Sequence, residues 1–110
     1  MSAGIDFERR VRTDLEGNGY WTMRAAGSHG AVDVLAIKPG QILGVQCKLS
    51  KLLISPAERT ALLDWAARCD AVPLVASRVR QGRRTVVVYR RLTGVGPKEW
   101  VPWVADEVAA

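Results

Sequence analysis

At 110 residues the chain is long enough for one compact domain and too short for two independent hydrophobic cores. Apolar residues make up 48% of the sequence and charged residues 25%, which excludes an intrinsically disordered chain. Sixteen Lys and Arg oppose eleven Asp and Glu, giving a net charge of +5, and twelve of the cations are Arg. Because Arg binds phosphate through two parallel hydrogen bonds, this bias favours a nucleic-acid partner.

The cysteines and the N-terminus indicate an intracellular setting. Cys47 and Cys69 lie in apolar surroundings at a spacing that matches no metal or redox motif, so both are expected to be reduced packing residues. Residues 1–7 lack a basic segment followed by an apolar run, and no stretch is long enough to span a bilayer. We therefore expect a soluble cytoplasmic protein without a membrane partner.

The N-terminal segment, residues 4–16, is predicted to form a helix because apolar residues recur along it at helical spacing. These residues are Phe7, Val11 and Leu15. A glycine-rich stop signal follows at residues 17–19. On a helical wheel Glu8 lies at the edge of the apolar stripe, so we expect its side chain to be half-buried.

Three strands are predicted to follow this helix, with a loop rich in turn-forming residues between the first and the second. The strands cover residues 20–25, 32–37 and 42–48, and the loop covers residues 26–30. The second strand is a nearly continuous apolar run, typical of a buried strand, and its single charged residue is Asp33. A turn at residues 38–41 joins the second strand to the third.

A second helix is predicted from its start signal. Ser55 occupies the N-cap position, Pro56 the first helical position, and Glu58 lies three residues after the cap, which is the pattern of a capping box. The helix is expected to run to about Cys69.

Two more strands are predicted over residues 73–77 and 85–91, the latter entered through the basic stretch 78–84. The tail after Gly94 is interrupted by prolines and is expected to end in a short helix, with its tryptophans serving as packing or dimer contacts. The order α-β-β-β-α-β-β predicts a single α/β domain over residues 1–110, with a core over about 4–92, a C-terminal tail over 93–110 and a mixed five-stranded sheet flanked by helices.

The predicted hairpin at residues 38–41 brings polar side chains together. A two- or four-residue loop pairs Ile37 with Ile42 and places Asp33 opposite Gln46, with Lys48 on the same face; an odd-length loop would shift this register by one residue. Directly opposed residues have Cβ atoms roughly 5 Å apart, which suits two oxygen ligands on one hard cation.

A carboxylate, an amide oxygen and a lysine on adjacent strands can serve a metal-dependent phosphodiesterase. A bound metal polarises the phosphoryl group and acidifies water, Lys48 orients that water or neutralises developing charge, and Glu8 would complete the metal shell. Taken singly, these residues also have ordinary roles: an acid in the first turn of a helix, a loop-edge acid, a core amide and a solvated lysine. Their joint occurrence favours the nuclease.

Asp33, followed after twelve residues by Gln46-Cys47-Lys48, resembles the PD-(D/E)xK nuclease motif. More closely, the chain resembles the archaeal-type Holliday junction resolvases over residues 4 to about 77. The segments that carry the resemblance are Phe7-Glu8-Arg9-Arg10, Arg24-Ala25-Ala26-Gly27-Ser28, Val32-Asp33-Val34-Leu35-Ala36 and Gln46-Cys47-Lys48.

This resemblance implies a restriction-endonuclease-like fold in a homodimer that nicks a four-way DNA junction symmetrically, leaving 5′-phosphate and 3′-hydroxyl ends. It implies a Mg²⁺ site, which Mn²⁺ would also occupy, a role for Lys48 in activating water, and a place for Ser28 near the cleaved phosphate. The implied metal ligands are Glu8, Asp33, Gln46 and the backbone carbonyl of Cys47.

The resemblance also implies contacts between arginines and the DNA backbone, and the basic hairpin and loops are expected to add others. The full set of expected DNA contacts is Arg9, Arg10, Arg24, Ser28, His29, Lys51, Arg83 and Arg84. His29 could alternatively act as a base. A genome-processing role in a bacterial or phage-infected cytoplasm would follow.

The chain departs from the family pattern at two positions. Gln46 stands where the family has Glu, and an amide binds Mg²⁺ more weakly than a carboxylate; Val32 replaces the usual proline. Two other functions therefore stay open: a nuclease of the same superfamily that cuts flaps or duplex DNA, and a module that binds branched DNA without cutting it.

Overall fold

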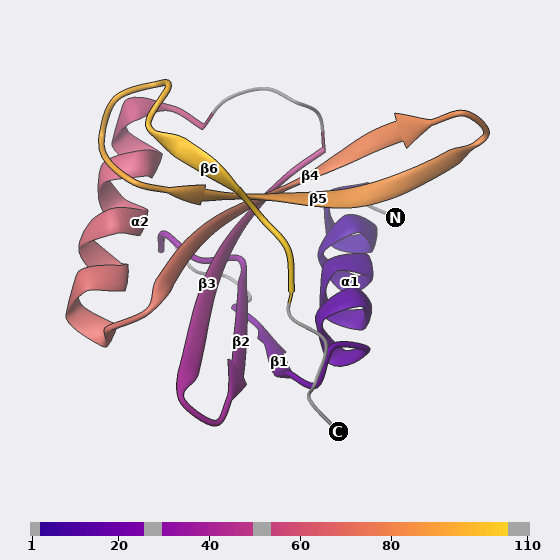
Figure 1. Ribbon diagram of the computed structural model, residues 1–110, viewed down its shortest axis with the longest axis horizontal. Coiled ribbons are helices and arrows are strands. Elements are labelled where there is room, and N and C mark those ends of the chain that lie inside the picture. The colour runs from indigo at the N-terminus through magenta and orange to yellow at the C-terminus, as the bar shows by residue number, and fades with distance from the viewer. Residues whose placement is uncertain (1–2, 26–29, 50–53, 106–110) are drawn as a thin grey trace.

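The computed structural model describes residues 3–25, 30–49 and 54–105, and within these ranges a strongly twisted sheet lies between two helices (Figure 1). The helices are α1 (Ala3–Glu16) and α2 (Pro56–Cys69). The strands are β1 (Trp21–Arg24), β2 (Val34–Lys38), β3 (Gln41–Lys48), β4 (Val72–Gln81), β5 (Arg84–Leu92) and β6 (Trp100–Trp103). They are ordered β1-β2-β3-β4-β5-β6 in the sheet.

Both predicted helices are confirmed. Helix α2 begins with the predicted capping box, because the Ser55 side chain accepts a hydrogen bond from the Glu58 N–H and the Glu58 side chain accepts one from the Ser55 N–H. It connects β3 to β4, which are parallel, whereas the other described strand pairs are antiparallel. The predicted mixed sheet is therefore confirmed.

The two helices cover opposite faces of the sheet. Strand β4 shows this alternation, because Leu74 and Ala76 pack in the cluster that contains α1, whereas Val75 packs in the cluster that contains α2. Helix α1 contributes its predicted apolar stripe to the first cluster. Helix α2 contributes Leu62 to the second, and Trp65 packs at its edge.

The hairpin between β2 and β3 has the predicted register. Ile37 pairs with Ile42 and Lys38 pairs with Gln41, so the loop contains only two residues. Gly40 has a φ of 77°, a conformation that glycine adopts without steric cost. The ladder ends at the pair of Val34 with Val45, and Asp33 follows directly beyond this end.

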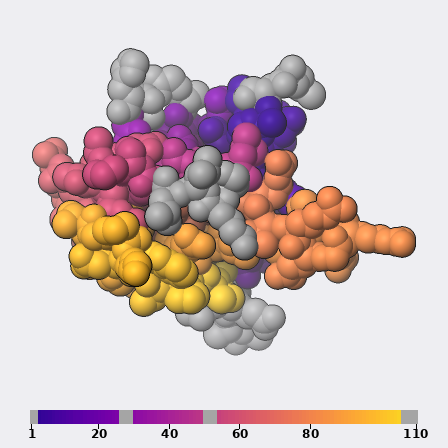
Figure 2. Space-filling view, turned by 90° about the horizontal axis from the view of Figure 1, so that it is seen from above, coloured from indigo at the N-terminus to yellow at the C-terminus, as the bar shows by residue number. Residues whose placement is uncertain are grey.

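The second half of the sheet is larger than predicted. The basic stretch 78–84 is not an entry loop: it extends β4 and turns at Gly82, whose φ is 63°, into β5. The resulting hairpin pairs residues from Leu74 to Gln81 with residues from Arg84 to Arg91. Figure 2 shows this orange hairpin projecting beyond the rest of the molecule.

A sixth strand, β6, corrects the prediction of five. Its sequence contains Pro102, which lacks an N–H and argued against a strand, but β6 lies at the edge of the sheet, where proline is tolerated. The Trp103 ring packs edge-on against Tyr89, with the ring centroids 5.4 Å apart, so Trp103 has the predicted packing role. The short helix predicted for the end of the tail falls largely on residues 106–110, outside the described residues.

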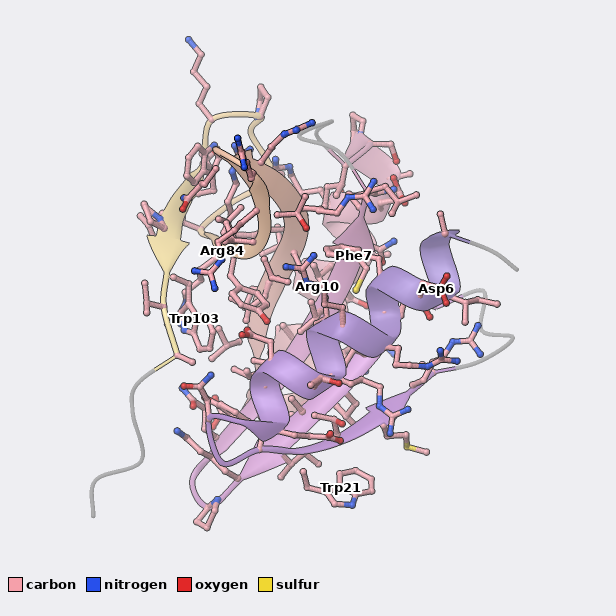
Figure 3. The ribbon with its side chains drawn as sticks, turned by 90° about the vertical axis from the view of Figure 1, so that its right-hand side faces the viewer. Asp6, Phe7, Arg10, Trp21, Arg84 and Trp103 are labelled. Carbon is pink, nitrogen blue, oxygen red and sulfur yellow. The ribbon has the colours of Figure 1, made fainter. Side chains whose placement is uncertain are left out.

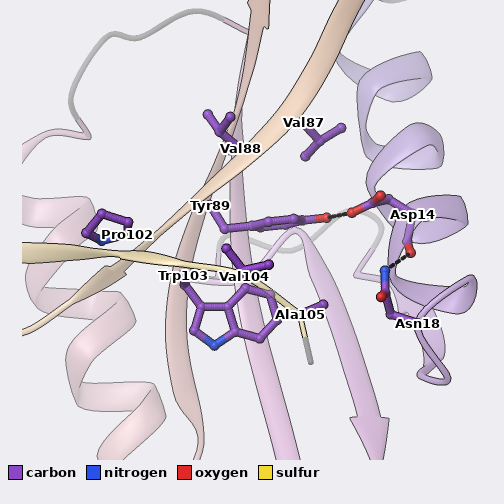
Figure 4. A pocket seen from close by; sticks show the side chains of 9 residues that line it. All are labelled: Asp14, Asn18, Val87, Val88, Tyr89, Pro102, Trp103, Val104 and Ala105. Atoms are coloured by element: carbon purple, nitrogen blue, oxygen red, sulfur yellow. Dashed lines mark hydrogen bonds between the residues drawn. The ribbon is translucent and has the colours of Figure 1, made fainter. Parts of the chain in front are cut away.

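A hydrogen bond also ties α1 to β5. The Tyr89 hydroxyl donates to Asp14 Oδ2 at 2.6 Å, beside a hollow that Trp103 also lines (Figure 4). Burial and the Asp14 carboxylate raise the pKa of Tyr89 far above its ordinary value, so the phenol stays neutral and keeps this bond.

Candidate active site

Asp33 lies at the point where β1, β2 and β3 meet. Its backbone carbonyl accepts from the Ala25 N–H at 2.9 Å and its N–H donates to the Val45 carbonyl at 2.8 Å. Its carboxylate accepts from the backbone N–H of Cys47, with 2.8 Å between Oδ2 and N. Asp33 is thus held against β3 by its backbone and its side chain. The ladder stops one pair earlier, at Val34 and Val45, so the predicted pairing of Asp33 with Gln46 is not formed.

Charged groups from both helices surround the Asp33 carboxylate. Burial raises the pKa of Asp33, and the Cys47 N–H partly offsets this by stabilising the ionised form. Glu8 from α1 and Glu58 from α2 raise the pKa further, while Lys48 lowers it. A titratable group whose pKa is shifted by burial and by several charged neighbours is characteristic of a functional site.

Gln46 and Lys48 extend from β3 to Glu58, for which the sequence predicts only a role in the helix cap. Lys48 Nζ lies 2.7 Å from Glu58 Oε2, and Gln46 Nε2 donates to the same oxygen at 3.4 Å. Glu58 was overlooked because the capping box accounts for it fully. A signal was nevertheless present, since a capping carboxylate uses one oxygen for the backbone and leaves the other for a second partner.

Glu8 is half-buried, as predicted, and pairs with Arg24 at 2.6 Å between Oε1 and Nε. The predicted metal ligand and the predicted DNA contact are therefore bound to each other. Among the residues that the structure describes, no three His, Cys, Asp or Glu side chains are grouped closely enough to hold a metal ion. Glu8 and Glu58 influence Asp33 electrostatically, but Glu8 is paired with Arg24 and Glu58 with Lys48.

Cys47 plays no nucleophilic part in this arrangement. Burial raises the pKa of its thiol far above the ordinary value of 9.0, and the Asp33 and Glu8 carboxylates raise it further. The thiol is therefore protonated at neutral pH, as expected for a packing residue. The same prediction is wrong for Cys69, which is free and exposed at the end of α2 rather than packed in the core.

The chain matches the family model described as archaeal Holliday junction resolvase (Hjc) over residues 1–100. It belongs to this family. It is 33% identical over 76 residues to the crossover junction endodeoxyribonuclease Hjc of Methanocaldococcus jannaschii, covering 66% of this chain and 56% of that protein's length. Its structure is similar to that of the Holliday junction resolvase Hjc of Archaeoglobus fulgidus, with a TM-score of 0.66, 24% identity, and coverage of 80% of this chain and 71% of the other.

In this resolvase-family chain, the predicted DNA-contacting arginines have different surroundings. Arg9 is exposed and pairs loosely with Asp6, at 3.7 Å. Arg10 binds the side chain and carbonyl of Thr85 and so fastens α1 to β5, on the side of the molecule where Arg84 also lies (Figure 3).

Arg83 and Arg84 are exposed at the tip of the projecting β4–β5 hairpin. The remaining predicted site residues, Ser28, His29 and Lys51, lie outside the described residues.

No helix in the described part of the chain is both long enough and apolar enough to cross a membrane.

Proposed function

We propose that this chain is a Mg²⁺-dependent endonuclease that resolves four-way DNA junctions by paired, symmetric nicks. One observation carries the proposal: in a member of the resolvase family, Glu8 and Glu58 from the two helices and Lys48 from the neighbouring strand all act electrostatically on the half-buried Asp33. This arrangement gathers negative charge where a hydrolytic metal would be held and supplies a cation beside it.

The proposed ligands suit a hard divalent cation by type, because all of them offer oxygen atoms. Among the described residues no three acids are grouped closely enough to hold a metal ion, so Glu8 would have to leave Arg24 to join Asp33 on one. We propose Glu8, Asp33, Gln46 and the Cys47 carbonyl as the ligands of Mg²⁺, or of Mn²⁺ in its place. When bound, the metal would polarise the scissile phosphoryl group and acidify a water molecule.

Lys48 has two tasks in this proposal. Its ammonium group would orient the attacking water and balance the negative charge that develops on the phosphoryl oxygens. The Cys47 N–H holds the Asp33 carboxylate in one orientation, so this carboxylate is positioned before substrate arrives. Ser28 is proposed to lie near the cleaved phosphate.

Two symmetric nicks require two active centres, so we propose a homodimer. The exposed Arg9 and the hairpin tip would contact the DNA backbone together with Arg24, His29 and Lys51. Arg10, whose guanidinium also binds Thr85, is proposed to contact the DNA backbone as well.

The proposal is tested by measuring cleavage of a labelled four-way junction, a flap and a linear duplex of matched sequence in Mg²⁺. We expect the junction to be cut fastest, and Lys48→Ala to abolish cutting of all three while leaving junction binding intact. Faster cutting of flap or duplex would instead support the other nuclease function. Binding without cutting under any divalent ion, reversed by Gln46→Glu, would support the binding module.

The hairpin tip provides a second prediction. Replacing both Arg83 and Arg84 by Ala should weaken junction binding and reduce the slope of log affinity against log salt concentration by about 2, because each phosphate contact contributes about 0.9. Arg68→Ala is the matched control, since Arg68 is also exposed but pairs with Asp64 on α2. An unchanged salt slope in the double variant would place the hairpin tip away from DNA.

A further inference from the structure

The positive charge of the chain is concentrated in one segment of its C-terminal half. Residues 71–98 contain seven of the sixteen Lys and Arg and no Asp or Glu, so the other nine cations face all eleven acids. The rest of the chain is therefore slightly acidic, and the net charge of +5 comes entirely from this segment. Such an asymmetry indicates which surface meets a polyanion.

Four of these cations lie on the part of the β4–β5 hairpin that extends beyond its neighbouring strands, residues 78–87, which we call the basic arm. Among the described residues, the pairing of β4 with β3 ends at Ser77, and β6 pairs only with residues 89–92. The basic arm is therefore a two-stranded ribbon that projects from the rest of the sheet (Figure 2). Its exposed arginines are Arg78, Arg80, Arg83 and Arg84.

The side of the basic arm that faces α1 carries three guanidinium groups. Ala76 of β4 packs toward α1, so the alternation of the strand brings Arg78 and Arg80 to the same side. Arg10 of α1 reaches this side and binds the hydroxyl of Thr85, the residue that pairs with Arg80. We call Arg10, Arg78 and Arg80 the arginine row. The opposite side of the arm differs, because its alternating positions include the valines Val79 and Val86.

The arginine row has no acid to neutralise it. Within the described part of the chain, Arg78 and Arg80 pair with no carboxylate, and Arg10 binds only Thr85. Arg80 Nε donates to the carbonyl of Gly82 at 3.1 Å. Unpaired guanidinium groups keep their full capacity to bind phosphate. Three arginines of the helices differ from the row in pairing with an acid on their own helix, and these are Arg9, Arg12 and Arg68.

The basic arm begins at the edge of the sheet that holds the candidate active site. Lys48, the last residue of β3, pairs with Ser77 in the parallel ladder, and Arg78 is the next residue along β4. Asp33 also lies at this edge, directly beyond the last pair of the β2–β3 ladder. Each residue of a strand adds about 3.3 Å, so Arg80 lies roughly 10 Å beyond Lys48 along the strand direction. DNA whose scissile phosphate lies at this edge can therefore continue along the arm.

We propose that the arginine row binds the phosphate backbone of the duplex that flanks the cleavage site, and so holds one arm of the branched DNA against the active-site edge. This inference rests on the proposed junction-cleaving function. It assigns DNA contacts to Arg78 and Arg80 and separates them from the contacts proposed for the hairpin tip. Because the row offers phosphate only charge and hydrogen-bond donors, its contacts are independent of base sequence.

The test measures binding of the full chain to a four-way junction in EDTA, over a range of salt concentrations. Arg78→Gln/Arg80→Gln is expected to lower the slope of log affinity against log salt by about 2, since each phosphate contact contributes about 0.9. The affinity should fall about 10- to 100-fold in salt of roughly 0.1 M. The melting temperature should not change, because both side chains are exposed.

Two control variants separate the position of the charges from their number. Arg68→Gln/Arg91→Gln also removes two exposed cations, but Arg68 lies on α2 and Arg91 lies near the other end of β5, so the salt slope should stay close to that of the wild type. Arg78→Lys/Arg80→Lys should keep most of the slope, because the release of counterions depends on charge. A linear duplex of matched sequence should show the same loss in Arg78→Gln/Arg80→Gln as the junction does.

An unchanged salt slope in Arg78→Gln/Arg80→Gln overturns the inference. An equal loss in Arg68→Gln/Arg91→Gln also overturns it, because only total charge would then matter, as does a loss that the linear duplex does not share. These measurements contain no divalent ion, so they are independent of cleavage. A chain that shows the expected loss but cuts no junction would overturn only the proposed function.

Discussion

Asp33→Asn should reduce junction cleavage by roughly 10³-fold without lowering the stability of the fold. The amide removes the charge that a divalent ion would require, but it keeps an oxygen that can accept from the Cys47 N–H. Burial and the nearby carboxylates raise the pKa of Asp33 in the folded protein, so the ionised form is disfavoured there. A neutral side chain at this position relieves that cost.

The pH dependence of stability gives an independent check on this reasoning. The pKa of Asp33 is raised in the folded protein from its ordinary value of 3.8. Protonated Asp33 therefore contributes to the stability of the folded state below pH 3.8, and this contribution is lost as the pH rises through the pKa of the folded state. Asp33→Asn should remove the loss of stability that Asp33 causes as the pH rises. Thermal melts of both proteins between acidic and neutral pH would show it, and a lower melting temperature for the variant at neutral pH would contradict it.

Gly44→Ala should destabilise the protein by about 2–3 kcal/mol, which is at the upper end of the range for overpacking a core. A Cβ at this position would overlap Trp65 Cζ3 and lie 2.8 Å from two other ring atoms, so the ring or the strand must move. Gly44 lies two residues before Gln46, and any such shift would also disturb the contact of Glu58 with β3.

Urea unfolding measures this effect, and a double-mutant cycle with Trp65→Leu identifies its cause. Because the smaller side chain leaves room for a methyl group, the cost of Gly44→Ala should fall markedly in the Trp65→Leu background. A Gly44→Ala protein as stable as the wild type, or a cost that is equal in both backgrounds, would show that the close approach of α2 to β3 is not what this position requires.

Local patterns in the sequence were sufficient to predict much of this fold. The apolar spacing of α1, the capping box of α2 and the two-residue turn after Lys38 each depend on residues close together in the chain. The turn was the most informative, because its register placed Asp33 at the same end of the sheet as Lys48. The resemblance to a nuclease motif reached the same two residues by another route.

The features that could not be predicted depend on contacts between distant segments. The pairing of Glu8 with Arg24 requires α1 to lie over β1, and the pairing of Lys48 with Glu58 requires α2 to lie over β3. Strand β6 was missed because Pro102 opposes strand formation locally, and only its place at the sheet edge makes it acceptable. No periodicity of the sequence reports such contacts.

The most direct test of the proposed function is to map the cleavage sites on a four-way junction with each strand labelled in turn, in the presence of Mg²⁺. We predict nicks at symmetrically related positions on two opposing strands, each leaving a 5′-phosphate and a 3′-hydroxyl, and a rate of nicking that falls by roughly 10³-fold in Asp33→Asn. A junction that is bound but left intact with every divalent ion, or nicking by Asp33→Asn at the wild-type rate, would contradict the assignment of the active site.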